Sequence, residues 1–439
     1  MPTREQHDVL VIGGGVSGLT AAIELATHGV DVRVVEARSR LGGRIATDDV
    51  AGLSVETGGE FLDAVDTPFA RLLGALDVEL EPAVHEKQPE RGAVVLGGRH
   101  VRPSAHALDL VAALDAEIER VAGSLDPEHP WEAERADALD ATSLAGWVVQ
   151  QGGDPEALAL VEAMYAVGGS TVPTAQMSLL AMAAKQTRRG PPAGRLSRRI
   201  AGGAAAFAIA AGERLEHRVL LDAPVLGLEH GSDGVALELR DGRRLRARVA
   251  IVAVPLGPSR ALAISPLPQQ ERLAALAALR TGHDVKAHVA FATPWWRESA
   301  TPFLPAISDS ACGAVYEGPI GHPGAALTCF VGALPAMRLL QLPAPGRVAA
   351  ILEALEVAAG RAFPEPALGM RIDCWNEQPE TAGSYLVLRT GELTTHRDAL
   401  RRPTGRVVYA GAEASSSPSF IAGAAEAGAR AASLARELL

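Results

Sequence analysis

Three glycines near the start of the chain have the spacing of a turn that binds phosphate groups. Gly13, Gly15 and Gly18 form G-x-G-x-x-G directly after the apolar run 9–12. In such a turn the first glycine permits the tight bend, the second lets the backbone approach a pyrophosphate, and the third lets the helix pack closely on the strand. The positive end of the following helix then attracts the pyrophosphate. The spacing therefore predicts a dinucleotide site at this turn.

An acidic residue follows at the position where such sites bind the adenosine ribose. Glu36 lies 23 residues after Gly13, directly after the second apolar segment, 32–35. A carboxylate there can accept hydrogen bonds from both ribose hydroxyls and repels a 2′-phosphate. We therefore expect an unphosphorylated adenosine ribose. The motif alone does not separate NAD from FAD.

The elements that must position this turn can be followed along the chain. The strand, turn, helix and strand of residues 8–36 predict the opening unit of a doubly wound sheet, so the fold class is α/β. Apolar residues recur at helical spacing over 104–183, and a loop rich in Pro, Gly and Arg follows at 188–194. Residues 219–254 alternate as strands and contain two glycine turns, which predicts an antiparallel meander. Further helices are expected at 269–279, 345–359 and from 422, and further strands at 285–291, 327–331 and 407–411.

The composition is typical of a folded protein and excludes several classes of function. The 439 residues are 48% hydrophobic and carry a net charge of −11, which excludes a disordered regulator and a basic surface for nucleic acid or lipid. The length predicts two or three domains. The three cysteines and 12 histidines lack the spacing of a disulfide framework or a metal site. No signal peptide and no apolar run of about 18 residues is found, so we expect a cytoplasmic protein without a membrane anchor.

One lysine stands out because the chain otherwise uses arginine as its cation. Only Lys87, Lys185 and Lys286 occur among the 41 basic residues, and the first two lie among polar neighbours. Alternation along the strand 285–291 puts Lys286 and His288 on one face. A solvated strand face is one interpretation of Lys286, and a role for its compact ammonium group is the other. For His288 we expect a structural role with a local hydrogen bond.

Two segments beyond Glu36 resemble the flavin-binding segments of the flavin monoamine oxidase family. They read Ala-Arg-Ser-Arg-Leu-Gly-Gly-Arg at 37–44 and Glu-Thr-Gly-Gly-Glu at 56–60. The similarity continues at 202–203, 223–225, 253–255, Lys286, Trp375, 383–385, 409–413 and 419–424. It implies FAD as the cofactor and a Rossmann-like FAD-binding domain interleaved with an α+β substrate-binding domain. The FAD-binding domain would comprise 1–83, 196–268 and 379–439, and the substrate-binding domain 84–195 and 269–378.

The resemblance also implies cofactor contacts residue by residue. For seven residues it implies which part of FAD they contact. Glu36 would bind the adenosine ribose, Arg38 and Arg44 would lie near the adenosine and phosphates, and the backbone of Val225 would contact the adenine. Gly411 and Glu413 would contact the ribityl and phosphate region, and the backbone N–H of Ile421 would reach the flavin pyrimidine edge. The other expected contacts are Gly13, Gly15, Ser17, Gly18, Ala37, Gly43, Gly58, Gly59, Glu60 and Trp375.

Three residues match the family positions that act on the substrate. In the family, the lysine that Lys286 matches holds a water at flavin N5, and Tyr385 and Phe420 match the two walls of an aromatic cage that faces the flavin. The family often has tyrosine at both cage positions, so Phe420 lacks one hydroxyl; core packing is the alternative role for this pair. Ser384 stands where covalently flavinylated relatives carry a cysteine, so FAD is expected to be non-covalent.

The resemblance predicts FAD-dependent oxidation of an amine to an imine by hydride transfer to flavin N5. The imine would hydrolyse to a carbonyl, and dioxygen would be reduced to hydrogen peroxide. The expected partners are a small-molecule amine and O2, without nucleic acid; the oligomeric state is open, with a homodimer as one alternative. A carbon–carbon desaturase or protoporphyrinogen-type oxidase of the same fold is the alternative function, and a flavin-binding protein without turnover is a third. Two roles remain open for Glu60: a structural carboxylate, or an anchor for a second cationic group of the substrate.

Overall fold

The computed structural model of the chain describes residues 6–64, 67–83, 92–190, 194–298, 303–318, 325–416 and 418–439. The larger of its two main sheets has eight strands. At its centre β1 (Gln6–Ile12) pairs in parallel with β2 (Val32–Val35) on one side and β13 (Arg244–Val252) on the other. The run 9–12 is buried, because a central parallel strand is covered on both faces. The predicted opening unit is confirmed.

The rest of this sheet contains the predicted meander. The remaining strands are β10 (Val219–Leu220), β11 (Val225–Gly231), β12 (Gly234–Leu239), β14 (Ala263–Ser265) and β20 (Val407–Tyr409), in the order β10-β2-β1-β13-β12-β11-β14, with β20 also paired to β13. β11, β12 and β13 pair in antiparallel fashion, as predicted. β10 departs from the prediction, because it pairs in parallel with β2 and lies outside the meander.

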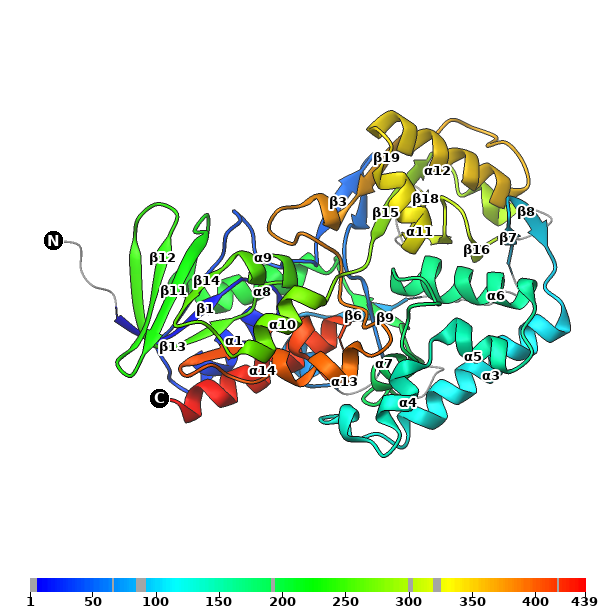
Figure 1. Cartoon of the computed structure of the whole chain (residues 1–439). Coiled ribbons are helices and arrows are strands. Elements are labelled where there is room, and N and C mark those ends of the chain that lie inside the picture. The colour runs from blue at the N-terminus through cyan, green and yellow to red at the C-terminus, as the bar shows by residue number, and fades with distance from the viewer. Residues whose placement is uncertain are drawn as a thin grey trace.

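Two helices that are far apart in the sequence pack together on this sheet. α1 (Val16–Thr27) follows the glycine turn and contacts α14 (Ile421–Glu437), as Figure 1 shows. Their backbones approach closely because small residues lie between them: a Cβ atom on Gly428 would lie 2.2 Å from the carbonyl oxygen of Ser17. Gly29, with φ of +75°, follows the end of α1, where a left-handed glycine stops a helix. The first and last helices therefore form one layer.

The second main sheet has seven strands in the order β19-β15-β18-β17-β16-β7-β8. They are β7 (Val94–Leu96), β8 (Arg99–Val101), β15 (Asp284–Phe291), β16 (Ala306–Ser308), β17 (Ala314–Glu317), β18 (Ala325–Gly332) and β19 (Gly369–Asp373). β15 pairs with β18 on one side and β19 on the other, and all its residues are buried. The interpretation of Lys286 as part of a solvated face is wrong for this reason.

The segment 104–183 is mostly helical, as predicted, and its π-helical part, together with α11 (Ala333–Leu340) and α12 (Ala344–Ala359) later in the chain, packs on the second sheet. The helices of the segment are α3 (Ala105–Ala122), α4 (Ala136–Ala141), α5 (Leu144–Gln150), α6 (Pro155–Val161), a π-helical segment (Glu162–Ser170) and α7 (Leu179–Ala184). Figure 1 shows α3, α5 and α6 on the side of the molecule away from β12. The other helices are α2 (Pro68–Ala75), α8 (Ala205–Leu215), α9 (Leu256–Ala261), α10 (Gln270–Ala278) and α13 (Glu392–His396).

The strands of the two main sheets alternate along the chain. The larger sheet takes strands from 6–35, 219–265 and 407–409, and the second from 94–101, 284–332 and 369–373. The hairpin β3 (Thr47–Val50) and β4 (Leu53–Glu56) and the small sheet of β5 (Phe61–Leu62), β6 (Leu80–Pro82) and β9 (Arg198–Ile200) were not predicted. The exact domain division given above stays a prediction. Within the described residues, no helix is long and apolar enough to cross a membrane.

Candidate active site

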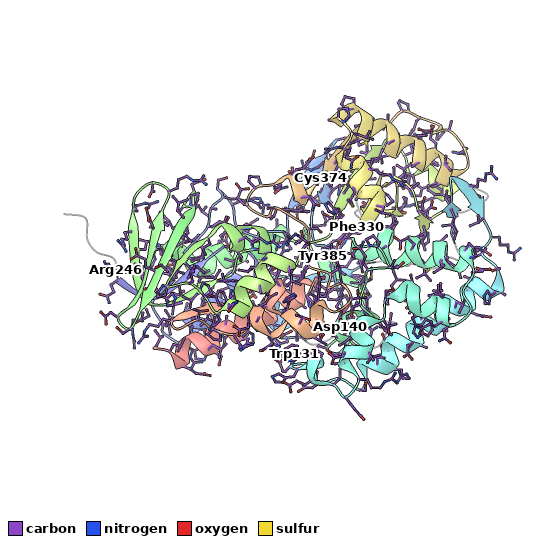
Figure 2. The ribbon with its side chains drawn as sticks, viewed as in Figure 1. Trp131, Asp140, Arg246, Phe330, Cys374 and Tyr385 are labelled. Carbon is purple, nitrogen blue, oxygen red and sulfur yellow. The ribbon has the colours of Figure 1, made fainter. Side chains whose placement is uncertain are left out.

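A cavity of about 570 Å³ is lined by residues from both main sheets. Its wall runs from the glycine turn after β1 to β15 and the start of α14. All the expected site residues line it except Gly18 and Glu413. Tyr385 and Phe330, two residues of the wall, lie near the middle of the molecule (Figure 2). Of the 20 site residues predicted from the sequence, 18 therefore line one cavity.

The glycine turn has the three steric requirements that its spacing predicts. Gly13 has φ of +103°, and a Cβ atom there would lie 2.9 Å from the carbonyl oxygen of Ala253. A Cβ atom on Gly18 would lie 2.0 Å from the carbonyl oxygen of Gly13, so Gly18 lets α1 pack on the turn and does not line the cavity. Gly15 lines the cavity and has only the backbone of Gly43 within 4 Å of such an atom. A phosphate can therefore approach the backbone at Gly15.

Glu36 is buried at the end of β2 and fixes the geometry of the turn. Its Oε2 accepts a 2.6 Å hydrogen bond from the amide of Gly14, and its Oε1 accepts a 2.9 Å hydrogen bond from the amide of Arg38. Each oxygen keeps a further lone pair for a ligand in the cavity. Arg38 lines the same wall, and its guanidinium group lies 5.8 Å from the centre of the Trp375 ring.

Arg44 and Glu413 form an ion pair behind the cavity wall. Arg44 Nη1 lies 2.8 Å from Glu413 Oε1, and Nη2 lies 3.1 Å from Oε2. Arg44 also donates a 2.7 Å hydrogen bond to the carbonyl oxygen of Ser384. Because Arg44 lines the cavity and Glu413 does not, Glu413 holds the guanidinium group in place from behind.

A hydrogen bond joins the first glycine turn to the last one. The amide of Gly411, which has φ of +92°, donates a 2.8 Å hydrogen bond to the hydroxyl of Ser17. Trp375 is fixed by a 3.0 Å hydrogen bond from its Nε1 to the carbonyl oxygen of Thr57. The other expected cofactor contacts that line the wall are Ala37, Gly43, Gly58, Gly59, Glu60, Val225 and Ile421.

Lys286 forms a buried ion pair with Glu60. Its ammonium Nζ lies 2.8 Å from Glu60 Oε2 and 3.2 Å from the carbonyl oxygen of Gly58. Tyr316 donates a 3.1 Å hydrogen bond to the same carboxylate oxygen, and burial together with this carboxylate raises the pKa of Tyr316 well above its ordinary range. Two of the three N–H groups of Lys286 are thus engaged, which leaves one for a ligand or water.

His288, on the same face of β15, has the structural role expected of it. Its Nδ1 lies 3.0 Å from the hydroxyl of Thr328, and its Nε2 lies 3.0 Å from the carbonyl oxygen of Glu56. Burial, with a smaller effect of Lys286, lowers the pKa of His288 to about 3. The ring is therefore neutral at pH 7 and serves to join β15 to β18 and to the hairpin of β3 and β4.

Tyr385 and Phe420 both line the cavity, as the cage interpretation requires. The hydroxyl of Tyr385 donates a 2.9 Å hydrogen bond to the carbonyl oxygen of Gly169, and burial raises its pKa. Phe420 stands at the N-cap of α14, and the guanidinium group of Arg189 lies 4.4 Å from the centre of its ring. Arg189 is outside the cavity wall and is paired with Asp63 at 2.6 Å.

Among the cavity residues that were not predicted from the sequence are three aromatic ones and one acidic one beside Lys286. Phe61, Asp284, Tyr316 and Phe330 line the cavity beside the predicted residues. A signal existed for Asp284, because it lies two positions before Lys286 on one strand and therefore points to the same side. The others come from segments whose distance from Lys286 in space cannot be derived from spacing. The described residues contain no group of His, Cys, Asp and Glu that could hold a metal ion.

Comparison with known proteins identifies the family of the chain. The family described as flavin containing amine oxidoreductase matches residues 16–435. The chain belongs to this family. It is 29% identical to putrescine oxidase from Kocuria rosea over 93% of this chain and 90% of the relative, and 25% identical to flavin-containing amine oxidase A from Equus caballus over 98% and 85%.

Solved structures of amine oxidases have the same fold. Putrescine oxidase bound to putrescine superposes with a TM-score of 0.88 and 25% identity over 99% of both chains. Cyclohexylamine oxidase from Brevibacterium oxydans superposes with a TM-score of 0.85 and 25% identity, covering 99% of this chain and 100% of the other. The chain is therefore a FAD-dependent oxidoreductase that acts on amines, and the desaturase alternative is not favoured.

Proposed function

We propose that FAD lies in this cavity without a covalent bond and that the expected residues hold it. Gly15 and the start of α1 would receive the pyrophosphate, and Glu36 the adenosine ribose. Arg44, held by Glu413, would lie near the phosphates, and Gly411 near the ribityl chain. The fit is supported by the close approach at Gly13 and Gly18, where a Cβ atom would collide with backbone. Ser384 has no thiol for a thioether.

The inner end of the cavity would hold the amine. When bound, FAD supplies an acceptor for the hydride from the carbon next to the amine nitrogen and later passes the electrons to dioxygen. Lys286 would hold a water with its remaining N–H group, and Glu60 would keep the ammonium group in position. Tyr385 and Phe420 would align the amine between their rings. The observation that carries the proposal is the presence of Lys286 and both aromatic rings on the wall that contains the glycine turn.

We propose further that the enzyme is cytoplasmic and reduces O2 to hydrogen peroxide. All three cysteines are free and buried, which suits a reducing compartment. Glu60 is engaged by Lys286 and Tyr316, so a structural carboxylate is favoured over an anchor for a second cationic group. The two domains and their boundaries are proposed as given above.

The proposed function is tested with a panel of amines on the purified holoenzyme. The panel contains primary arylalkylamines, N-methylamines, cyclic amines, diamines and amino acids. We expect at least one to reduce the flavin without oxygen, and to yield a carbonyl product and hydrogen peroxide in air. Flavin reduction without peroxide in air would retain amine oxidation and exclude O2 as the acceptor. No flavin reduction by any amine would contradict the proposal.

A further inference from the structure

Asp284 is a buried carboxylate on the cavity wall with an unsatisfied oxygen. Its side chain belongs to β15, two residues before Lys286, and the residue is 5% exposed. It lines the cavity. Its Oδ1 is buried and has no hydrogen-bond partner, and the same is true of the hydroxyl of Ser384. The Ser384 hydroxyl is near enough to favour the ionised carboxylate, yet the two groups form no hydrogen bond of normal geometry.

The other carboxylates on the cavity wall are satisfied by the protein itself. Among the described residues these are Glu36, Glu60 and Glu380. Glu36 accepts two backbone N–H groups. Glu60 is paired with Lys286, and Glu380 lies 3.3 Å from Nε of Arg38. Asp284 differs from them because its buried Oδ1 has no hydrogen-bond partner among the described residues.

The two cations that act on Asp284 are each paired with another carboxylate. Lys286 and Arg44 both favour its ionised form. Lys286 lies 2.8 Å from Glu60, however, and Arg44 lies 2.8 Å from Glu413. Burial raises the pKa of Asp284 to about 6, so the group is still largely ionised at pH 7 and above. The inner end of the cavity therefore carries an uncompensated negative charge, which is unfavourable in a buried site.

A ligand that satisfies Asp284 must bring a donor or a positive charge. The ring of oxidised flavin offers a single N–H, on the pyrimidine edge that the family resemblance assigns to Ile421, and the ribityl hydroxyls are assigned to the neighbourhood of Gly411. An amine nitrogen offers N–H donors, is positive when protonated, and gains positive charge as hydride leaves the neighbouring carbon. A fixed carboxylate stabilises such a charge more strongly in a site that excludes water.

We propose that Asp284 is the anchor for the amine nitrogen of the substrate, which it holds by a charge-assisted hydrogen bond. The inference rests on the proposed function and adds the group that recognises the amine. It assigns selectivity for an amine over an uncharged molecule of the same shape to one side chain. Tyr385, the neighbouring cage residue, would provide the apolar wall, and Asp284 the charge.

The test compares binding of an amine with binding of its alcohol analogue to Asp284→Asn. The amine is the one that reduces the flavin fastest in the panel, and the alcohol has the same skeleton with OH in place of the amino group. Both are titrated calorimetrically into dithionite-reduced holoenzyme under anaerobic conditions, where the amine is not oxidised. We expect Asp284→Asn to weaken amine binding on the order of tenfold or more, as for a lost hydrogen bond to a charged group, and to leave alcohol binding nearly unchanged.

Glu380→Gln is the matched control, because it removes a carboxylate of the same wall that already has a partner. It should keep the preference for the amine. Flavin content and reduction potential are measured for every variant, and Asp284→Ser serves as a second substitution if the asparagine variant loses flavin. An unchanged preference, an equal loss for amine and alcohol, or a shift of the potential alone overturns the proposal. If no amine reduces the wild-type flavin, the proposed function itself fails, which is a separate result.

Discussion

Lys286 Nζ and Glu60 Oε2 lie 2.8 Å apart across 226 positions of sequence, and both groups are buried. The pair connects β15 with the segment after β4. A buried ion pair of this kind contributes little net stability, but removal of one partner leaves an uncompensated charge. A variant that removes Lys286 therefore also has to replace Glu60, so that no unpaired charge is left buried.

Lys286→Met should destabilise the fold by about 3–5 kcal/mol, because the buried Glu60 would lose its partner at 2.8 Å and keep the hydroxyl of Tyr316 and the more distant Arg199, at 4.0 Å. The double substitution Lys286→Met and Glu60→Gln should recover most of this loss. Urea unfolding of the two variants and of Glu60→Gln measures the coupling. In the double variant the flavin should remain bound while its reduction or reoxidation slows in rapid-mixing experiments. Unchanged rates would contradict a role for Lys286 at the reacting atoms.

The aromatic cage predicts unequal effects of two substitutions. Tyr385→Ala removes a wall of the cavity and should lower kcat/KM for the best amine by roughly 100-fold, because a reacting carbon displaced by about 1 Å slows the reaction by a factor of this order. Phe420→Tyr only adds a hydroxyl and should have a much smaller effect. Steady-state kinetics with a flavin spectrum for each variant checks this. Small and equal effects would assign both rings to core packing.

Acid precipitation should release the flavin into the supernatant, since Ser384 offers no thiol and the three cysteines are Cys312, Cys329 and Cys374, all buried. The absorbance of the supernatant and its mass spectrum identify the released molecule as FAD. Yellow colour retained by the precipitated chain after denaturation would show a covalent bond and refute this prediction.

Gly18→Ala should abolish or greatly weaken FAD binding. A Cβ atom at this position would lie 2.0 Å from the carbonyl oxygen of Gly13, so α1 would have to move away from the turn. Gly74→Ala in α2 is the control, because nothing lies within 4 Å of a Cβ atom there and alanine favours a helix. The flavin-to-protein absorbance ratio after purification measures the effect. Equal ratios in both variants would contradict the steric role of Gly18.

Glu56 should make the fold less stable as the pH rises. Burial raises the pKa of Glu56 to about 7 from an ordinary value of 4.5, against the opposing effect of Lys286. The folded state therefore binds the proton more tightly than the unfolded state, and this stability is complete below pH 4.5 and is lost between about pH 4.5 and 7. The loss amounts to about 3 kcal/mol, since one pKa unit is about 1.4 kcal/mol.

Glu56→Gln keeps an oxygen that can accept the hydrogen bond from the amide of Ala204 and removes the titration. It should be more stable than the wild type at pH 8 and similar to it at pH 4.5. Glu24→Gln, an exposed change on α1, should show no such trend. Thermal unfolding at the two pH values is sufficient, and parallel curves for all three proteins would exclude the effect.

The sequence predicted those parts of the molecule in which neighbours along the chain decide the structure. The turn at Gly13, the helix after it and the meander of β11 to β13 follow from local spacing and were confirmed. The burial of Lys286 was not predictable, because it depends on β18 and β19 as neighbours of β15. The ion pair with Glu60 and the isolated charge of Asp284 depend on contacts between distant segments in the same way. The alternation of residues along β15 indicates only that Asp284 and Lys286 point to the same side of the sheet.

The pairing of β20 with β13 has a consequence for how the protein is made. The turn after β1 leaves the ribosome early, whereas the turn after β20 and the helix α14 that covers α1 are synthesised much later. At 5–20 residues per second, roughly 20–80 s separate Ile12 from Val407. During this interval the nascent chain exposes the small-residue face of α1 and lacks the part of the cavity wall that Gly411, Ala412 and the start of α14 supply. The wall of the cofactor cavity is therefore complete only after the start of α14 has been synthesised.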